Sequence, residues 1–251
     1  MLQSDPPLAG RMALITGAAA RIGAEIARTL HAQGMDLALH YRSSAAEAQA
    51  LQVELEQRRP GSVLLVHADL NDTVALPQLI EQVANFRLRL DLLVNNASSF
   101  YPTPLDTATE AQWDDLFGSN LKGPFFLAQA AAPLLRASAG AIVNLVDIHA
   151  ERPLADHPLY CMAKAGNAMM VRALARDLGP AVRVNGVAPG AILWPEQGKD
   201  EAAQRDILTR TALGRPGTPA DVARTVLFLV RDADYITGQI INVDGGRTVQ
   251  Q

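Results

Sequence analysis

Short apolar runs, each bounded by turn-forming or polar residues, recur along the whole chain. Seven of them have the length of buried strands: Met12–Thr16, Leu37–His40, Val63–Ala68, Leu90–Val94, Ala141–Val146, Val182–Val187 and Ile240–Val243. Because these runs are continuously apolar and do not alternate with polar positions, they are typical of a parallel sheet that is covered on both faces.

Helical patterns fill the intervals between the runs. We expect helices at Ala45–Arg58, Val74–Asn85 and Tyr160–Leu178, before Gly140, and where Ile22, Ile26 and Leu30 recur at spacing four. Regular alternation of strand and helix predicts an α/β fold: a single-domain, Rossmann-type, doubly wound parallel sheet of about seven strands with helices on both faces. Ligands of such sheets bind beyond the carboxyl ends of the strands, so functional residues should follow the runs directly.

Composition and charge favour a protein that acts on small molecules. A chain of 251 residues with 49% hydrophobic content can bury one large core. The formal net charge is -4 and the basic residues are scattered, which gives no electrostatic basis for binding nucleic acid or an acidic membrane. The long apolar window Leu127–Val146 is interrupted by Pro133 and Gly140, so it predicts a helix, a turn and a strand and not a membrane span.

The N-terminal segment and the single cysteine indicate a cytoplasmic protein. Residues 1–10 lack the features of a signal peptide and are expected to be a flexible lead before one domain at 11–251. Cys161 cannot form an intrachain disulfide, and Cys161 and Met162 are interpreted as packing residues. The five histidines have no metal-ligand spacing, so no metal is expected. Of these, His149 and His157 are expected in solvent-facing loops, and the alternative is that one of them lines the pocket.

A glycine-spaced turn follows the first run. Gly17 would permit a tight turn and Gly23 a close approach of helix and strand, while free amides at the start of the helix would attract a pyrophosphate. Small residues can also serve only to pack a helix on a sheet. The order strand, turn and helix favours a nucleotide site.

The end of the second run indicates which nucleotide is bound. Enzymes that use NAD usually have an acidic residue here, whereas this chain has Tyr41-Arg42-Ser43. Arg42, with Ser43 beside it, could pair with a 2′-phosphate, which favours NADPH; the alternative is a solvated loop arginine. Asp69, after the third run, could accept a hydrogen bond from the adenine amino group or act as a helix N-cap.

Tyr160 and Lys164 lie four residues apart in an expected helix. This spacing puts the phenol and the ammonium group on one face. The positive charge would lower the tyrosine pKa, so that Tyr160 could donate a proton near neutral pH. Taken alone, such a pair is more often a solvated helix face.

Several ordered motifs accompany this pair. They are Asn95-Asn96-Ala97, Asn120, Pro189-Gly190, Ile236-Thr237-Gly238-Gln239 and Val243-Asp244-Gly245-Gly246. From Arg11 to Gly246 the chain resembles the short-chain dehydrogenase/reductase family. The resemblance implies that Asn120 orients the lysine and a water chain; the alternative is a buried asparagine at a helix kink. It also implies a homotetramer built on the long helices and the C-terminal strand.

Three positions depart from the broad family and are similar to the pteridine reductase subgroup. Arg21 and Ser98 replace usual glycines, and Asp147 replaces the usual catalytic-site serine. The resemblance also implies that Phe100 stacks on the pterin. Independently, a carboxylate suits an aminopyrimidine ring that needs acceptors and a relayed proton, whereas a serine suits a carbonyl. Alternatives are a capping aspartate at Asp147 and a pyrophosphate clamp at Arg21.

We therefore expect an NADPH-dependent pteridine reductase that reduces the C=N bond of a pterin, dihydropterin or dihydrofolate-like ring. Its catalytic residues would be Asn120, Asp147, Tyr160 and Lys164. The cofactor would contact Gly17, Arg21, Ile22, Gly23, Tyr41, Arg42, Ser43, Asp69, Asn96, Ala97, Ser98, Tyr160, Lys164, Pro189 and Gly190. The substrate would contact Arg21, Ser98, Phe100, Asp147 and Tyr160.

Two other functions are compatible with the same motifs. The rivals are a carbonyl reductase acting on 3-ketoacyl thioesters and a non-catalytic NADPH-binding sensor. The polar segment Ala191–Leu213, which contains Trp194, is expected to be a mobile loop that closes over the substrate.

Overall fold

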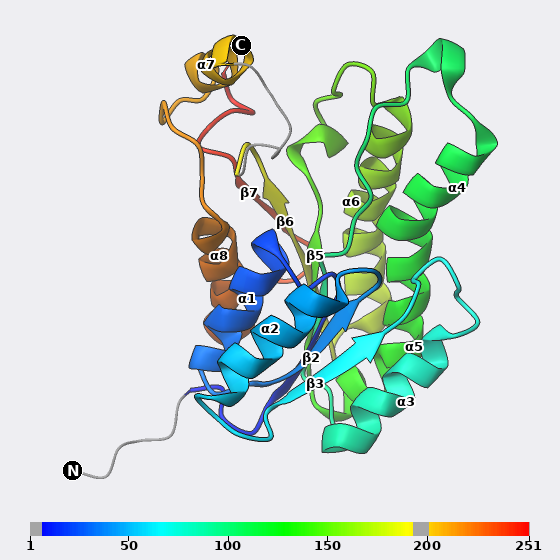
Figure 1. Ribbon diagram of the computed structural model, residues 1–251, viewed down its shortest axis with the longest axis vertical. Coiled ribbons are helices and arrows are strands. Elements are labelled where there is room, and N and C mark those ends of the chain that lie inside the picture. Colours follow the sequence, from blue (N-terminus) through cyan, green and yellow to red (C-terminus); the bar gives the residue numbers. More distant parts are fainter. Residues whose placement is uncertain (1–6, 193–200, 251) are drawn as a thin grey trace.

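The computed structural model of the chain describes residues 7–192 and 201–250 (Figure 1). Its centre is a seven-stranded sheet in the order β3-β2-β1-β4-β5-β6-β7. Every neighbouring pair of strands is parallel. The strands are β1 (Met12–Ile15), β2 (Asp36–Tyr41), β3 (Val63–His67), β4 (Leu92–Asn95), β5 (Ala141–Leu145), β6 (Arg183–Pro189) and β7 (Ile240–Val243). All seven apolar runs form strands, and the predicted doubly wound fold is confirmed.

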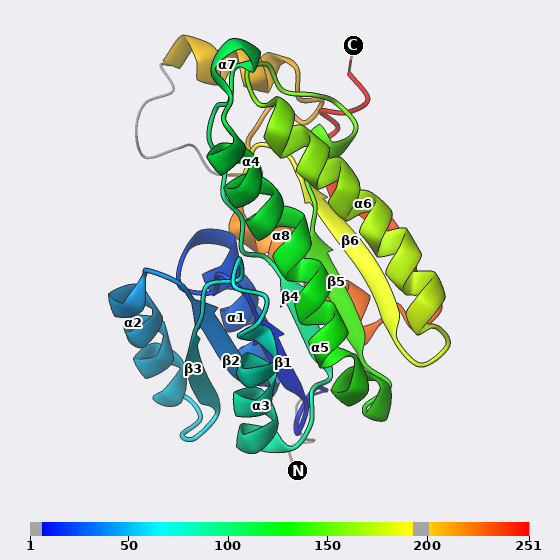
Figure 2. The same cartoon turned by 90° about the vertical axis from the view of Figure 1, so that its right-hand side faces the viewer.

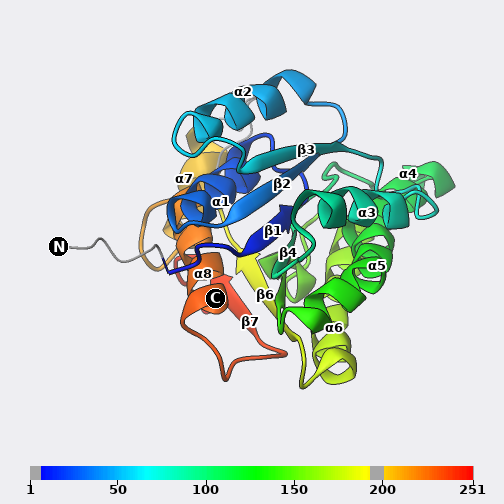
Figure 3. The ribbon, with the colours of Figure 1, turned by 90° about the horizontal axis from the view of Figure 1, so that it is seen from below.

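Helices cover both faces of the sheet (Figures 2 and 3). One face carries α1 (Arg21–Ala32), α2 (Ala45–Glu56) and α8 (Pro219–Arg231), with α1 packed against α8. The other carries α3 (Leu76–Arg87), α5 (Gly123–Ala137) and α6 (Pro158–Leu178), preceded by α4 (Glu110–Phe117). Two 3-10 turns at Leu105–Thr107 and Ile148–Ala150, a π-helical turn at Gly118–Lys122, and α7 (Glu201–Thr209) complete the described elements.

Burial on both faces explains the continuous apolar runs. In β1, Ala13 and Ile15 belong to the cluster packed under α1 and α8, whereas Met12 and Leu14 belong to the cluster under α3 and α5. Successive strand residues point to opposite faces, so a strand covered on both sides needs an apolar residue at every position.

The strand order reverses between β1 and β4, and this reversal positions the site. Ile15 is in register with Leu39 of β2 on one side and with Val94 of β4 on the other. The turn after β1 therefore lies between the ends of β2 and β4. Ligand sites of open α/β sheets form at this kind of switch point.

Helix boundaries and one connection differ from expectation. Helix α3 begins at Leu76 and not at Val74, and α6 begins at Pro158, where the missing proline N–H costs no helical hydrogen bond. The segment expected as a loop over the substrate contains α7, while residues 193–200, with Trp194, lie outside the described part of the chain. In the described part, no helix has both the length and the apolar character needed to cross a membrane.

Candidate active site

The turn after β1 has the geometry that its glycines predict. Gly17 has a φ of +60°, a region that favours glycine. A Cβ on Gly23 would lie 2.3 Å from the Gly17 carbonyl oxygen, so helix α1 can approach the strand only with glycine there. The Asn96 carboxamide donates to the carbonyls of Thr16 and Gly17, both at 2.9 Å.

Two amides of this turn, which precede the start of α1 at Arg21, are already hydrogen-bonded within the protein. The Gly17 N–H donates to Nδ1 of His40 at 3.2 Å, and the Ala18 N–H donates to the His40 carbonyl at 2.9 Å. A pyrophosphate at this turn therefore has to use the amides that follow, together with the Arg21 side chain. The sequence did not single out His40, because its partner residues are remote along the chain.

Arg21 opens α1 with an exposed side chain and a φ of +54°. A left-handed conformation costs a non-glycine residue about 1–2 kcal/mol. Strain of this kind persists where the surrounding structure holds it, and it concentrates at functional sites. The backbone thus retains the shape suited to a glycine while it presents a guanidinium group at the switch point.

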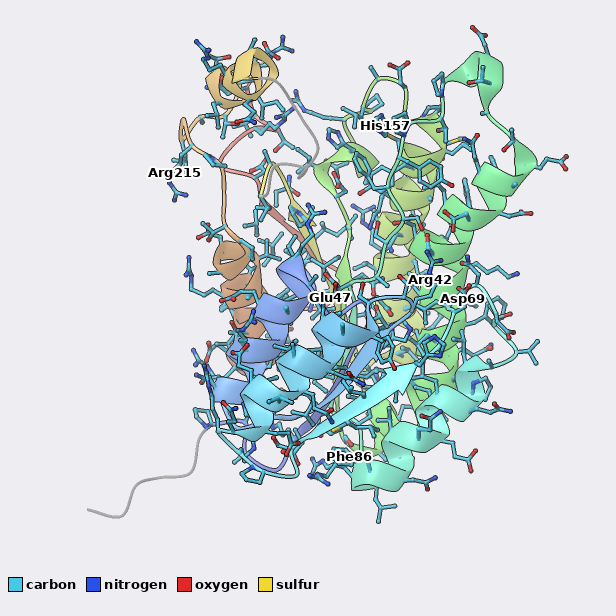
Figure 4. The ribbon with its side chains drawn as sticks, viewed as in Figure 1. Arg42, Glu47, Asp69, Phe86, His157 and Arg215 are labelled. Carbon is cyan, nitrogen blue, oxygen red and sulfur yellow. The ribbon has the colours of Figure 1, made fainter. Side chains whose placement is uncertain are left out.

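Arg42 and Asp69 project from the ends of β2 and β3 toward one another (Figure 4). The Arg42 guanidinium lies 4.0 Å from the Asp69 carboxylate and 3.8 Å from that of Asp115, and its side chain is about half exposed. Asp69 is no helix N-cap, since α3 begins at Leu76; its carboxylate accepts from the Asn71 N–H at 2.9 Å. Tyr41 is half-buried and Ser43 is exposed beside this group.

The structure brings Asp147 and Tyr160 into direct contact. The Tyr160 hydroxyl donates to Oδ2 of Asp147 at 2.8 Å. The other carboxylate oxygen accepts from the His149 N–H at 2.8 Å and caps the 3-10 turn Ile148–Ala150. The capping alternative for Asp147 is therefore present in one oxygen, while the other oxygen is bound to the candidate proton donor.

Burial shifts the pKa of Tyr160 upward, opposite to the expected direction. Tyr160 is buried, and this burial, followed by the Asp147 charge, raises the pKa of Tyr160 well above its usual value. The ammonium group of Lys164 donates to the Leu145 carbonyl at 2.8 Å and lies 5.7 Å from the centre of the Tyr160 ring. Burial lowers the pKa of Lys164 itself to about 8, against an opposing contribution from Asp147.

Asn120 lies in the π-helical turn between α4 and α5, where a kink was the alternative interpretation. Its carboxamide oxygen accepts from the Ser98 hydroxyl at 2.7 Å, and its Nδ2 donates to the Ser99 and Leu116 carbonyls, both at 3.0 Å. These bonds tie the segment after β4 to α4 and fix Asn120 next to the catalytic candidates.

A series of buried asparagine side chains, which the sequence did not predict, is hydrogen-bonded in a chain that ends at the backbone of Asn120. Asn95 donates to Asn144 at 2.9 Å, Asn144 donates to Asn167 at 3.1 Å, and Asn167 donates to the Asn120 carbonyl at 2.7 Å. The signal in the sequence was Asn144, an amide inside an otherwise apolar strand, since a buried polar group needs a partner.

Phe100 lies at the mouth of this group with its side chain 52% exposed. Its ring meets Tyr160 edge to face, and the His157 ring stacks on it at 4.8 Å with an interplanar angle of 14°. His157 is thus half-buried against Phe100, which agrees with the alternative of a pocket-lining position better than with a solvent-facing loop. Met162 is 46% exposed and does not pack in the core, whereas Cys161 is buried and accepts from the Leu154 N–H.

The ends of β6 and β7 close the site. The Gly190 N–H donates to the Val243 carbonyl at 3.0 Å, and a Cβ on Gly190 would lie 2.8 Å from the Asp244 Cα. Pro189 is the last residue of β6 and is buried. Within residues 7–192 and 201–250, no group of three metal-ligating side chains gathers in one place.

Comparison with known proteins shows which family the chain resembles. The family model described as enoyl-(acyl carrier protein) reductase matches residues 17–248. Pteridine reductase 1 of Leishmania tarentolae is 37% identical over 276 aligned positions, which cover 94% of this chain and 95% of that protein.

Ketoacyl reductases are similar to nearly the same degree. A putative ketoacyl reductase of granaticin polyketide synthesis from Streptomyces violaceoruber is 36% identical and covers 98% of each chain. The 3-oxoacyl-[acyl-carrier-protein] reductase of Staphylococcus aureus is also 36% identical, over 94% of this chain and 97% of its own. With the fold and the shared site pattern, these matches show that the chain belongs to the short-chain dehydrogenase/reductase family, as an NAD(P)-dependent oxidoreductase.

Proposed function

We propose that the protein is an NADPH-dependent pteridine reductase, which adds a hydride and a proton across the C=N bond of a pterin, dihydropterin or dihydrofolate-like ring. The observation that carries this proposal is the 2.8 Å hydrogen bond from Tyr160 to the carboxylate of Asp147. A carbonyl reductase would present a neutral hydroxyl at this position, whereas a carboxylate can accept from the amino and ring N–H groups of a pterin.

Charge at the end of β2 supports NADPH over NADH. Arg42 is a half-exposed guanidinium with no side-chain hydrogen bond among the described residues, and only two long ion pairs hold it. It is therefore available to pair with a 2′-phosphate, with Ser43 as a neighbouring donor. A free ribose 2′-hydroxyl would instead call for an acceptor, and no acidic residue follows β2 directly.

The glycine turn and the strand ends provide the rest of the nucleotide site. Gly17, Ile22 and Gly23 form the turn and helix start, Arg21 presents its guanidinium there, and Asp69 remains open to the adenine amino group. The segment Asn96-Ala97-Ser98 follows β4, and Pro189-Gly190 lies at the end of β6. When bound, NADPH would supply the hydride.

The catalytic residues supply and relay the proton. Tyr160 gives its hydroxyl proton to the ring nitrogen of the C=N bond, and the phenolate is reprotonated from solvent through the Asp147 carboxyl group. The ammonium group of Lys164 stabilises the transient phenolate and holds the nicotinamide ribose. Asn120 fixes Ser98 and the end of α4 around these groups.

Phe100 serves as the platform for the planar substrate. Its half-exposed ring lies against Tyr160, so a stacked pterin would have its ring nitrogens near the proton donor. Arg21 and Ser98 would contact both the cofactor and the ring. The segment Ala191–Leu213 would close over the bound ring, and its described residues include α7.

Steady-state assays test whether the site is catalytic. We expect the wild-type protein to oxidise NADPH in the presence of 7,8-dihydrobiopterin and Tyr160→Phe to lose about 100-fold or more in kcat. Tyr235→Phe, at a fully exposed tyrosine, is the matched control and should leave kcat unchanged. Equal activity of Tyr160→Phe and wild type would contradict the proposal and favour a non-catalytic NADPH-binding sensor.

A second candidate is a reductase of 3-ketoacyl thioesters. The similar identities of the ketoacyl reductases favour it, and it would retain Tyr160, Lys164 and Asn120. It gives Asp147 no role, since a carboxylate repels the oxyanion that develops when a carbonyl is reduced. This alternative requires that an acetoacetyl thioester, and not a dihydropterin, is turned over.

We propose that the enzyme is cytoplasmic and that it forms a homotetramer. Apolar side chains on the outer helices support the self-association. Phe125 and Met169 are 40% and 59% exposed on α5 and α6, and they line a groove of about 440 Å³. Contiguous apolar surface of this kind marks an interface. Light scattering should give four chains per particle, and Phe125→Glu should reduce that number.

A further inference from the structure

Both ring nitrogens of His40 are hydrogen-bonded to the backbone around the candidate nucleotide site. It is a residue of β2 and only 2% exposed. Its Nδ1 accepts from the Gly17 N–H at 3.2 Å, and its Nε2 lies 3.1 Å from the Ala68 carbonyl oxygen. Gly17 follows β1 and Ala68 follows β3, so the ring spans from one neighbouring strand to the other.

The two partners define the protonation state of the ring. The Gly17 N–H is a donor, so Nδ1 has to carry a lone pair; the Ala68 carbonyl is an acceptor, so Nε2 has to carry the proton. Only the neutral Nε2–H tautomer satisfies both. An imidazolium would direct a second N–H against that of Gly17.

The charges around His40 are compatible with this state. Burial, the largest cause, lowers the pKa of His40 to about 4, helped by His67 and Arg42 and opposed by the Ala68 hydrogen bond and Asp69. The ring is therefore neutral over the whole physiological range of pH.

The backbone of Gly17 is hydrogen-bonded at both its N–H and its carbonyl group. His40 accepts from its N–H, while the Asn96 carboxamide donates to its carbonyl at 2.9 Å. The His40 carbonyl also accepts from the Ala18 N–H at 2.9 Å. The turn is thus fixed from β2 on one side and from the segment after β4 on the other.

We propose that His40, as the neutral Nε2–H tautomer, is a positioning residue for the cofactor, which fixes the phosphate-binding turn at Gly17 and couples it to the adenine end at Ala68–Asp69. A turn that is already ordered loses less conformational freedom when the nucleotide binds. The proposal rests on the use of a nicotinamide cofactor, not on the identity of the reduced substrate.

Three variants separate the two hydrogen bonds from general packing. His40→Leu removes both bonds at similar volume. His40→Asn keeps an acceptor near the position of Nδ1 but is too short to reach Ala68. His31→Leu is the matched control, because His31 is also buried and hydrogen-bonded, to the Ser62 hydroxyl at 2.8 Å, but lies at the opposite end of α1 from the turn.

Fluorescence titration with NADPH, without any second substrate, measures the effect. We expect the Kd to rise about tenfold in His40→Leu and about threefold in His40→Asn, and to stay at the wild-type value in His31→Leu even where the melting temperature falls. At saturating NADPH, kcat should remain within about twofold of wild type. An unchanged Kd in His40→Leu, or an equal rise in His31→Leu, would overturn the proposal.

The wild-type protein provides a test that does not depend on a variant's folding. Nitrogen-15 spectra of the histidine rings should show a proton on Nε2 of His40, and its signals should not titrate near the ordinary histidine pKa of about 6.5. A proton on Nδ1, or titration near that value, would contradict the assignment whether or not the protein reduces pterins.

Discussion

The hydroxyl of Tyr160 donates to the carboxylate of Asp147 at 2.8 Å, so the proton of the phenol is held by a hydrogen bond to a carboxylate oxygen. Burial and the Asp147 charge raise the pKa of Tyr160, while Lys164 is directed to the Leu145 carbonyl. In the enzyme without cofactor, Tyr160 is therefore a neutral phenol that is ready to act as an acid.

Replacing the Asp147 carboxylate by an amide should reduce catalysis much more than it reduces stability. Asp147→Asn keeps an oxygen that can accept from the His149 N–H but removes the charge and the proton relay. We expect kcat with a dihydropterin to fall about 100-fold, with a much smaller loss of thermal stability. Activity of this variant close to wild type would remove Asp147 from the proposed mechanism. Steady-state kinetics and thermal melting together provide the measurement.

Lys164 should determine the alkaline limit of cofactor capture. Its pKa of about 8 means that the ammonium group is charged below that pH and loses its charge as the pH rises through it. The value of kcat/KM for NADPH, which reports groups of the free enzyme, should fall above about pH 8. Lys164→Gln should lower the whole profile and remove the bend. A bend that persists in this variant would assign it to another group.

The lowered pKa of Lys164 also predicts how the free energy of unfolding changes with pH. Because the folded-state pKa lies below the ordinary 10.5, the unfolded chain binds the additional proton between about pH 8 and that value. The contribution of Lys164 to the free energy of unfolding therefore increases with pH over this interval. Lys164→Met should lack this increase in denaturant titrations, and an identical slope in both proteins would contradict the shift.

Arg21 should show opposite effects on stability and binding. Arg21→Gly relieves the left-handed strain at φ +54° and should raise the free energy of unfolding by about 1 kcal/mol. It also removes a guanidinium from the switch point, so the Kd for NADPH should rise about tenfold. A glycine variant that binds NADPH as tightly as wild type would show that Arg21 has no role in the cofactor site.

Arg42 should determine the preference between the two nicotinamide cofactors. We expect Arg42→Ala to raise the KM for NADPH about 100-fold and to leave that for NADH within about threefold. Arg58→Ala, at an exposed arginine paired with Glu54 on the surface, is the control and should change neither value. An equal effect of Arg42→Ala on both cofactors would argue against recognition of the 2′-phosphate.

The sequence was sufficient for the sheet because each strand is covered on both faces. Met12 and Leu14 face one apolar layer and Ala13 and Ile15 the other, so the pattern alone reports their burial. The glycine turn was predictable for a similar reason: Gly17 and Gly23 have local steric causes.

Long-range contacts limited the prediction of the site. His40 lies 23 residues from Gly17 and 28 from Ala68, and the stack of His157 on Phe100 joins two separate loops. The pKa of Tyr160 depends on burial and on a carboxylate 13 residues away, and spacing to Lys164 alone gave the wrong direction. Side-chain direction and burial, which decide these features, follow only from the tertiary packing.

The most direct test compares kcat/KM for 7,8-dihydrobiopterin with that for an acetoacetyl thioester, both with NADPH, in the wild-type protein and in Asp147→Ser. A reductase of pterins should favour the dihydropterin by about 100-fold or more, and this ratio should fall at least about tenfold in the serine variant. Higher kcat/KM for the thioester in the wild-type protein would contradict the proposed function.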